Sequence, residues 1–88
     1  MADAWTEALG LMAGILTTGA FLPQVIKTWR TRAVRDLSLR MYLAMSAGVF
    51  LWLLYGLCLG SLSIILANGA TLALSLSILV MKLRYGRG

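Results

Sequence analysis

The chain has 88 residues, of which 60% are hydrophobic and 12% are charged, and its formal net charge is +5. Soluble domains carry about 25% charged residues, so this composition argues against a soluble helical domain and favours an integral membrane protein. A single cysteine, Cys58, and no histidine exclude an internal disulfide and leave no spacing for a transition metal, so the sequence predicts neither a metal site nor a cofactor.

The first predicted helix covers about residues 5–26 and contains a long run without charged side chains. A run of this length is enough to cross a bilayer once. Asp3 and Glu7 lie where a cleaved signal peptide would carry basic residues, so this segment is predicted to remain in the protein. Trp5 and Trp29 lie near the ends of the helix and are interpreted as anchors at the membrane interfaces.

The first helix contains the only proline of the chain, Pro23, within the sequence TTGAFLPQVIK. Proline removes a backbone donor and clashes with the carbonyl group four residues earlier, here that of Gly19, so a bend is expected. The bend suits a gating hinge, with a static kink as the alternative. Gln24 is a candidate for satisfying the freed backbone groups or for bonding across a dimer. Gly10 and Gly14 form a GxxxG pattern, which is typical of close helix packing.

Residues 41–81 carry no charge and would extend about 60 Å as one helix, roughly twice the hydrocarbon thickness, so this run must turn once. The turn is predicted at Gly60, and Ser38 is a candidate N-cap for the helix that precedes it. The remaining elements are predicted as a basic loop over about 27–37, a second helix over 38–59, a turn at about 60, a third helix over 61–83 and a basic tail over 84–88. The chain is therefore predicted to be a single domain, an all-α bundle of three transmembrane helices.

The eight basic side chains gather around two places, the connection between the first two helices and the segment after the third. Three spans put these two places on the same side of the membrane, and an excess of Lys and Arg marks the cytoplasmic side. The sequence therefore predicts a multi-pass protein of the cell (inner) membrane with its N-terminus outside and its C-terminus in the cytoplasm. We expect the basic loop to contact anionic membrane lipids rather than nucleic acid.

Each predicted helix carries one stripe of small, polar or aromatic residues at helical spacing, and such stripes are better guides to a cavity than hydrophobicity alone. The members are Gly10, Gly14, Thr17 and Phe21 in the first helix, Gly48, Trp52 and Tyr55 in the second, and Asn68, Thr71 and Ser75 in the third. Thr17, Gly48 and Thr71 are candidates for lining a pocket, although each threonine can instead return a hydrogen bond to its own backbone.

Trp52 and Asn68 are the strongest candidates for a binding site. Each lies eight residues from Gly60, so in a hairpin that turns there both lie about 12 Å inside the helix ends, close to mid-membrane. An indole for stacking and an amide that forms paired hydrogen bonds are the composition of a sugar site. The residues by themselves leave a second interpretation equally open, in which Trp52 fills space and Asn68 bonds a neighbouring helix.

The expected mechanism follows from two further features of the spans. No Asp, Glu, Lys, Arg or His lies deep in any of them, whereas proton-coupled transport normally needs a titratable group within the membrane, so passive facilitation is expected. Three helices are too few to surround a sugar-sized path, so a second copy is expected, related by a two-fold axis along the membrane normal and oriented the same way. The sequence thus predicts a transporter and not an enzyme.

Four segments carry a resemblance to a known family: FLPQVIKT at 21–28, RDLSLRMY at 35–42, LWLLYG at 51–56 and IILAN at 64–68. Their order and spacing resemble the PQ-loop superfamily and, within it, the SemiSWEET half-transporters, the three-helix bacterial relatives of the SWEET sugar uniporters. The resemblance covers roughly residues 8–83. It implies a parallel homodimer that moves mono- or disaccharides down their gradient by alternating access, with the third helix placed between the other two.

The resemblance also implies roles for individual residues. Trp52 and Asn68 would bind the sugar, Tyr55 would form the outer gate, and Phe21 would form the inner constriction. Pro23 would be the hinge. Some relatives reinforce the outer gate with a charged pair in the turn after the second helix, whereas that turn is uncharged here. The outer gate of this chain would therefore rest on Tyr55 and on packing.

Other functions remain open at this point. A PQ-loop transporter of an amino acid would need a more strongly polar or charged pocket than an amide and an indole provide. A holin-like pore former would leak ions, and a membrane assembly factor would not show saturable transport. A small multidrug exporter would be expected to carry a glutamate within the membrane, and this chain has none there.

Overall fold

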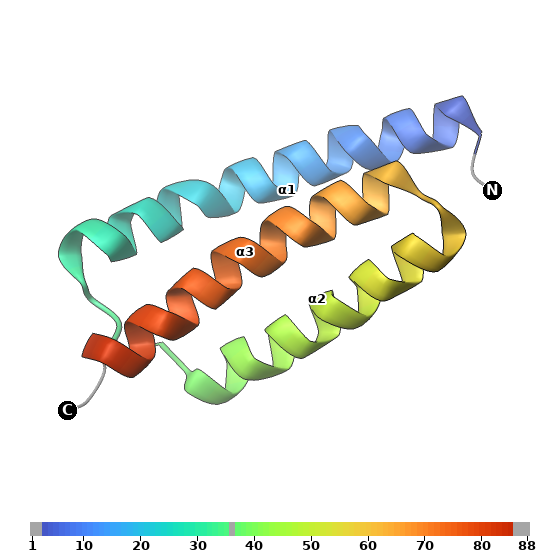
Figure 1. Cartoon of the computed structure of the whole chain (residues 1–88). Coiled ribbons are helices and arrows are strands. Elements are labelled where there is room, and N and C mark those ends of the chain that lie inside the picture. The colour runs from blue at the N-terminus through green and yellow to red at the C-terminus, as the bar shows by residue number, and fades with distance from the viewer. Residues whose placement is uncertain (1–2, 36, 86–88) are drawn as a thin grey trace.

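The computed structural model describes residues 3–35 and 37–85, which form three helices, α1 (Ala4–Thr31), α2 (Leu39–Leu59) and α3 (Leu62–Tyr85) (Figure 1). All three helices are long and apolar enough to cross a membrane. The prediction of an all-α protein with three apolar helices is confirmed. Most of the predicted basic tail lies outside the described residues.

α1 begins at an N-cap, because the Asp3 carboxylate accepts a hydrogen bond from the backbone N–H of Thr6 at 2.8 Å. The helix continues through Pro23, so its predicted end near residue 26 is corrected to Thr31. Proline removes only one hydrogen bond from the ladder, and the turn beyond it keeps its own bonds until Arg32. Arg32 takes a left-handed conformation (φ 55°) that ends the helix, and the loop is shortened to residues 32–38.

α2 and α3 form a helical hairpin. Ser38 accepts a hydrogen bond from the backbone N–H of Met41 at 3.1 Å, so it is the N-cap of α2 that its sequence context predicts. The chain then turns at Gly60, whose φ of 68° lies in the left-handed region that glycine adopts without a steric penalty. α3 begins two residues later, so the hairpin is tight.

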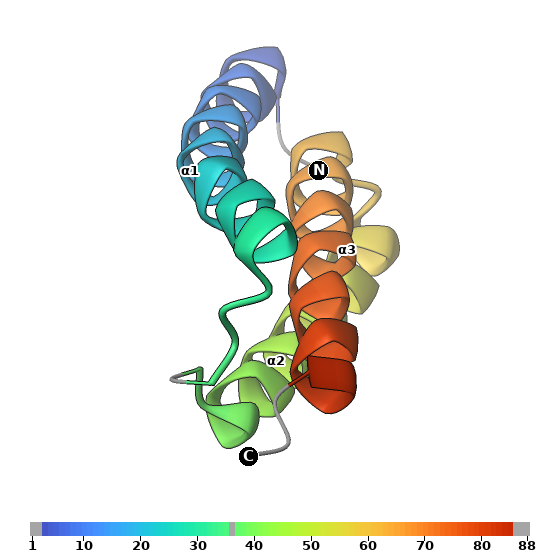
Figure 2. The ribbon, with the colours of Figure 1, turned by 90° about the vertical axis from the view of Figure 1, so that its left-hand side faces the viewer.

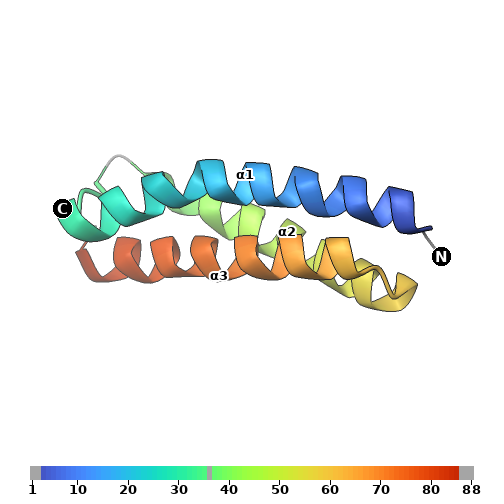
Figure 3. The ribbon, with the colours of Figure 1, turned by 90° about the horizontal axis from the view of Figure 1, so that it is seen from above.

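α3 lies between the other two helices. It packs against both α1 and α2, whereas α1 and α2 do not pack against each other within the described residues (Figures 1 and 3). α1 and α3 run parallel and α2 runs antiparallel to them, and the middle position of the third helix is as the family resemblance implies. The Cα atoms span 48 × 22 × 13 Å, so the bundle is elongated along its helices, and Figure 2 looks roughly along them, with α1 and α2 on different sides of α3.

The buried core of this bundle is small and lies toward the end that carries the 32–38 loop. It consists of Val25 from α1, Tyr42 from α2, and Ile78 and Leu79 from α3. Elsewhere large apolar side chains are exposed, and Trp5 is exposed by 85%. Three helices alone thus leave much apolar surface uncovered, which suits helices that meet lipid or another protein chain.

The 32–38 loop is held against the end of α3. Val34 is only 1% exposed, and the Lys82 Nζ donates hydrogen bonds to the carbonyl oxygens of Val34 and Arg35 at 2.9 and 3.0 Å. The Arg32 guanidinium lies 4.9 Å from the centre of the Tyr85 ring, in the geometry of a cation–π contact. The connection between α1 and α2 is therefore organised around α3.

Candidate functional site

Two contacts define the register of α2 against α3. Gly56, four residues before Gly60, packs on Ile64, four residues after it, and a Cβ added to Gly56 would lie 2.5 Å from the Ile64 Cγ2. Toward the other end, the buried hydroxyl groups of Ser46 and Ser75 are hydrogen-bonded at 2.8 Å. These residues lie fourteen and fifteen positions from the turn. Residues equally far from Gly60 in sequence therefore lie at the same level of the hairpin.

Trp52 and Asn68 meet this condition, since each lies eight residues from the turn. Trp52 is 56% exposed, and its ring meets that of Tyr55 edge to face, with centroids 5.5 Å apart and an interplanar angle of 83°. Gly48 has open space where a side chain would begin. Gly48, Leu51, Trp52 and Tyr55 line an open hollow of ≈ 440 Å³. We call these four residues the aromatic wall.

Asn68 lies in a groove of ≈ 290 Å³ between α1 and α3, which we call the amide groove. Its Nδ2 donates a hydrogen bond to the carbonyl oxygen of Ile64, one turn earlier, at 2.9 Å. A carboxamide offers two N–H donors and two acceptor lone pairs. Its own helix therefore satisfies one of these four groups, and within the described residues the other three are available to a ligand, water or a second chain. The groove is lined by Gly10, Ala13, Gly14, Thr17, Ser63, Ile64, Ala67, Asn68 and Thr71.

The polar residues of the predicted stripes separate into two groups. Thr17 and Thr71 both line the amide groove, but their hydroxyl groups donate to the carbonyl oxygens of Ala13 and Ala67 at 3.0 and 2.9 Å. Only their acceptor lone pairs face a ligand. Ser75 is fully buried in its bond to the second helix and takes no part in the groove, although its spacing placed it on the same stripe.

Gly10 and Gly14 allow α1 to approach α3 closely. A Cβ added to Gly10 would lie 2.9 Å from the Cβ of Ser63, and one added to Gly14 would lie 2.8 Å from the Cβ of Ala67. Real Cβ atoms do not approach so closely, so only glycine fits. The close packing predicted from the GxxxG pattern is confirmed, and the absent side chains leave room for the amide groove.

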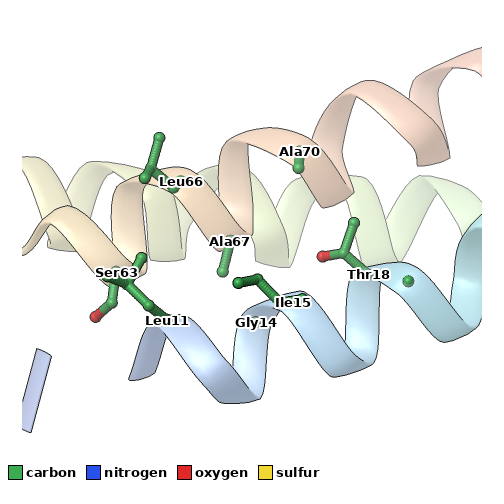
Figure 4. Close-up of a pocket in the computed structure, with 9 residues that line it drawn as sticks. Leu11, Gly14, Ile15, Thr18, Ser63, Leu66, Ala67 and Ala70 are labelled. Carbon is green, nitrogen blue, oxygen red and sulfur yellow. The ribbon is translucent and has the colours of Figure 1, made fainter. Parts of the chain in front are cut away.

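A second groove of ≈ 340 Å³ flanks the same glycine contact and is shown in Figure 4. Leu11, Ile15 and Leu66 form much of its wall. The Thr18 Oγ1 is buried and has no hydrogen-bond partner within the described residues. The largely apolar walls of this groove suit a hydrocarbon chain better than a hydroxyl-rich ligand.

The proposed hinge and inner constriction lie on the same helix but in different surroundings. Phe21 is partly buried and packs against the small core near the loop. Pro23 is exposed and borders a hollow of ≈ 600 Å³ whose lining extends along α1 from Gly19 to Thr31. The Gln24 side chain is exposed, and its backbone carbonyl oxygen accepts a hydrogen bond from the Thr28 hydroxyl at 2.8 Å. The structure therefore places Phe21 in packing and Pro23 at an open surface.

Glu7 is a candidate that the sequence reasoning missed. Its Oε1 accepts a hydrogen bond from the Ser61 hydroxyl at 2.6 Å, and its Oε2 accepts one from the backbone N–H of Ser63 at 2.8 Å. Ser61 also accepts a weak hydrogen bond from the Ile64 N–H at 3.4 Å. The uncharged turn after the second helix thus receives a carboxylate from α1. The signal for this contact was an isolated acid at the start of an apolar helix together with a Ser-x-Ser sequence after a turn.

Fold and site together define a small helical membrane protein whose binding surfaces are half-open. The aromatic wall and the amide groove lie at one level, but they are lined by different residues and both open to the outside of the bundle. The family model for the PQ loop repeat matches residues 5–65. The chain is 50% identical over 80 residues to the sugar transporter SemiSWEET of Bradyrhizobium diazoefficiens, covering 91% of this chain and 93% of the relative.

Two further relatives give the same result. The chain is 45% identical to the sugar transporter SemiSWEET of Leptospira biflexa, over 89% of this chain and 92% of the relative. Its structure is similar to a crystal structure of a bacterial homologue of SWEET transporters, with a TM-score of 0.82, 41% sequence identity, and coverage of 91% of this chain and 96% of the other. The chain belongs to the PQ-loop family, within its SemiSWEET branch.

Proposed function

We propose that the chain is a sugar transporter that moves mono- or disaccharides across the cell (inner) membrane by facilitated diffusion. The observation that carries the proposal is the level shared by Trp52 and Asn68 in a chain so similar to SemiSWEET sugar transporters. The exposed indole offers an apolar face for a sugar ring. The free groups of the amide offer paired hydrogen bonds to its hydroxyl groups.

The functional unit that we propose is a parallel homodimer. Two features support it: many large apolar side chains of one copy are exposed, and both binding surfaces remain open in one copy. A two-fold axis along the membrane normal would bring two aromatic walls and two amide grooves around one central cavity. Thr17, Gly48 and Thr71 would line this cavity beside the sugar.

The proposed orientation puts the N-terminus and the Gly60 turn outside the cell. The basic residues lie in the last turns of α1, in the 32–38 loop, at the start of α2 and from the end of α3 onward, and this end would face the cytoplasm and its anionic lipids. A membrane-impermeant thiol reagent added to intact cells tests this, because Cys58 is exposed and lies near the turn. Complete labelling is expected, whereas labelling of half the copies would indicate antiparallel partners.

Transport would proceed by alternating access. Tyr55 would close the cavity on the outer side and Phe21 on the inner side, while α1 bends at Pro23 with Gln24 beside it. Residues 8–26 and 41–81 contain no Asp, Glu, Lys, Arg or His, which supports uniport without proton coupling. Uptake into proteoliposomes should therefore be unaffected by a proton uncoupler. Accumulation against the sugar gradient that collapses with the uncoupler would contradict the proposal.

The site is tested by uptake into proteoliposomes with a panel of labelled sugars. Trp52→Ala and Asn68→Ala should each reduce saturable uptake to background without dissolving the dimer. Trp5→Ala is the matched control, because this equally large side chain is 85% exposed at the far end of α1. Normal uptake by both site variants would refute the assignment of the site.

A different small solute on the same scaffold is the second candidate. Unlabelled amino acids that compete with sugar uptake would favour an amino-acid substrate. A holin-like pore would instead release a trapped dye, and a transporter keeps the vesicles dye-tight.

A further inference from the structure

We propose that Glu7 is a positioning residue that keeps the N-terminal half of α1 attached to α3, so that α1 moves only beyond Gly19 during transport. The proposal rests on the transport function proposed above and adds a residue that directs the motion. Glu7 lies near the Gly60 turn, away from Trp52 and Asn68, so it would act without touching the sugar.

The contact made by Glu7 is a cap that one helix provides for another. The first N–H groups of a helix have no partner within the helix, and its N-terminus carries a partial positive charge. Glu7 accepts one of these N–H groups, that of Ser63, and also the hydroxyl of Ser61. Hydrogen bonds to a charged acceptor are roughly twice as strong as neutral ones. Ser61 and Ser63 are each only 6% exposed, so moving α1 away would leave poorly hydrated donors without partners.

The next two turns of α1 continue this attachment through backbone approach. Gly10 and Gly14 lie against Ser63 and Ala67 so closely that a Cβ on either glycine would meet the Cβ opposite within 3 Å. Because no flexible side chain lies between the two helices, nothing can adjust to keep this contact when α1 shifts away from α3. Residues 7–14 of α1 and the first turns of α3 therefore form one rigid unit.

Beyond this unit the contacts of α1 change in character. No atom lies within 4 Å of a Cβ added to Gly19, and Pro23 is exposed. Val25 reaches the core through its side chain, and the Trp29 Nε1 donates to the Ser77 hydroxyl at 3.3 Å. Side chains can repack during a movement, and proline removes one hydrogen bond that would resist bending. The second half of α1 is thus the part that can swing.

The two ends of the protein would then open differently. At the end with the 32–38 loop, α1 would bend away from α3. At the Gly60 end, α1 and α3 would move together against α2 or against the second copy. Without the Glu7 contact, the first half of α1 would no longer be held in place. Both halves of α1 would then move, and the bend at Pro23 would no longer move the second half relative to a fixed first half.

The test compares Glu7→Ala with Asp3→Ala, which removes a carboxylate at the same end that accepts a hydrogen bond from Thr6 of its own helix. Hydrogen exchange, which needs no sugar, should be at least tenfold faster at residues 62–65 in Glu7→Ala only, with residues 72–80 unchanged. The maximal rate of sugar uptake should fall at least fivefold, while the equilibrium Kd for the sugar stays within twofold. A purely structural role would lower thermal stability and leave the rate per folded dimer unchanged.

The conservative variant Glu7→Gln provides the rescue. Its carboxamide oxygen can still accept the hydrogen bond from the backbone N–H of Ser63, although without the charge. Glu7→Gln should therefore recover part of the uptake rate that Glu7→Ala loses, with slower hydrogen exchange at residues 62–65 than in Glu7→Ala. Equal uptake rates in Glu7→Gln and Glu7→Ala would overturn the proposal, as would a parental rate in Glu7→Ala. If the unsubstituted protein takes up no sugar, the proposed transport function is refuted. The hydrogen-exchange comparison, which needs no sugar, then still decides whether Glu7 anchors α1 to α3.

Discussion

Gly14 and Gly19 lie five residues apart on α1, and one added methyl group is predicted to have opposite effects at the two positions. At Gly14 the new Cβ would lie 2.8 Å from that of Ala67, about 1 Å inside ordinary carbon–carbon contact. Such overpacking costs about 1–3 kcal/mol. Replacing glycine by alanine in a helix stabilises it by about 0.5–1 kcal/mol, so the net loss of stability in Gly14→Ala should be at most about 2.5 kcal/mol. At Gly19 no atom lies within 4 Å, and only the gain of about 0.5–1 kcal/mol remains.

The comparison isolates packing, because the change in helix propensity is the same for both variants and cancels. The free energy of unfolding would be measured by titrating SDS into detergent micelles and following helix content by circular dichroism. Gly14→Ala should be less stable than Gly19→Ala by about 1–3 kcal/mol. Ala67→Gly should restore much of the loss in Gly14→Ala, since it removes the opposing methyl group. Equal stability of the two variants, or no effect of Ala67→Gly, would refute the close approach of α1 to α3.

Three further predictions concern other parts of the chain. Ser46→Ala should lower the free energy of unfolding by about 1–3 kcal/mol, because the buried Ser75 hydroxyl loses its partner on α2. In the same SDS titration, replacing both serines by alanine should lower it by less than the sum of the two single changes. Pro23→Ala should keep the fold and slow exchange of labelled sugar across the membrane several-fold, and an unchanged exchange rate would leave Pro23 without a mechanical role. Hydrogen bonds from the side chain and backbone of Thr6 hold the pKa of Asp3 below its ordinary value of 3.8. The cap is therefore fully formed above that value and lost as the pH falls through the lowered pKa, so the NMR shift of the Thr6 amide should titrate below pH 3.8 and stop doing so in Asp3→Asn.

The parts of the fold that follow from local sequence were predictable. Apolar runs of spanning length give three helices, and a serine before the second helix caps it because its hydroxyl group accepts a free backbone N–H. The level shared by Trp52 and Asn68 also follows from sequence, since it needs only the position of Gly60 and the rise of a helix. The end of α1 was harder to place, because proline lowers helix stability at one point without stopping the helix.

The surroundings of the candidate site could not be predicted in the same way. Thr17 and Ser75 belong to equivalent stripes, yet one lines the amide groove and the other is buried against α2. Spacing identifies the face of a helix on which a residue lies, and it does not say which neighbour that face meets. Glu7 illustrates the same limit, because the two residues that donate hydrogen bonds to its carboxylate, Ser61 and Ser63, lie more than fifty residues away in the chain.

By itself the sequence determined that this protein has three membrane-spanning helices, where they turn, and which indole and amide share one level. These features depend on composition, on helix rise and on a glycine, all of which act locally. Only the tertiary structure decided that α3 lies in the middle, that glycines bring α1 against it, and that Glu7 caps its first turn. In helices that are apolar on every side, the choice of neighbour depends on small differences in side-chain fit, which no single segment contains.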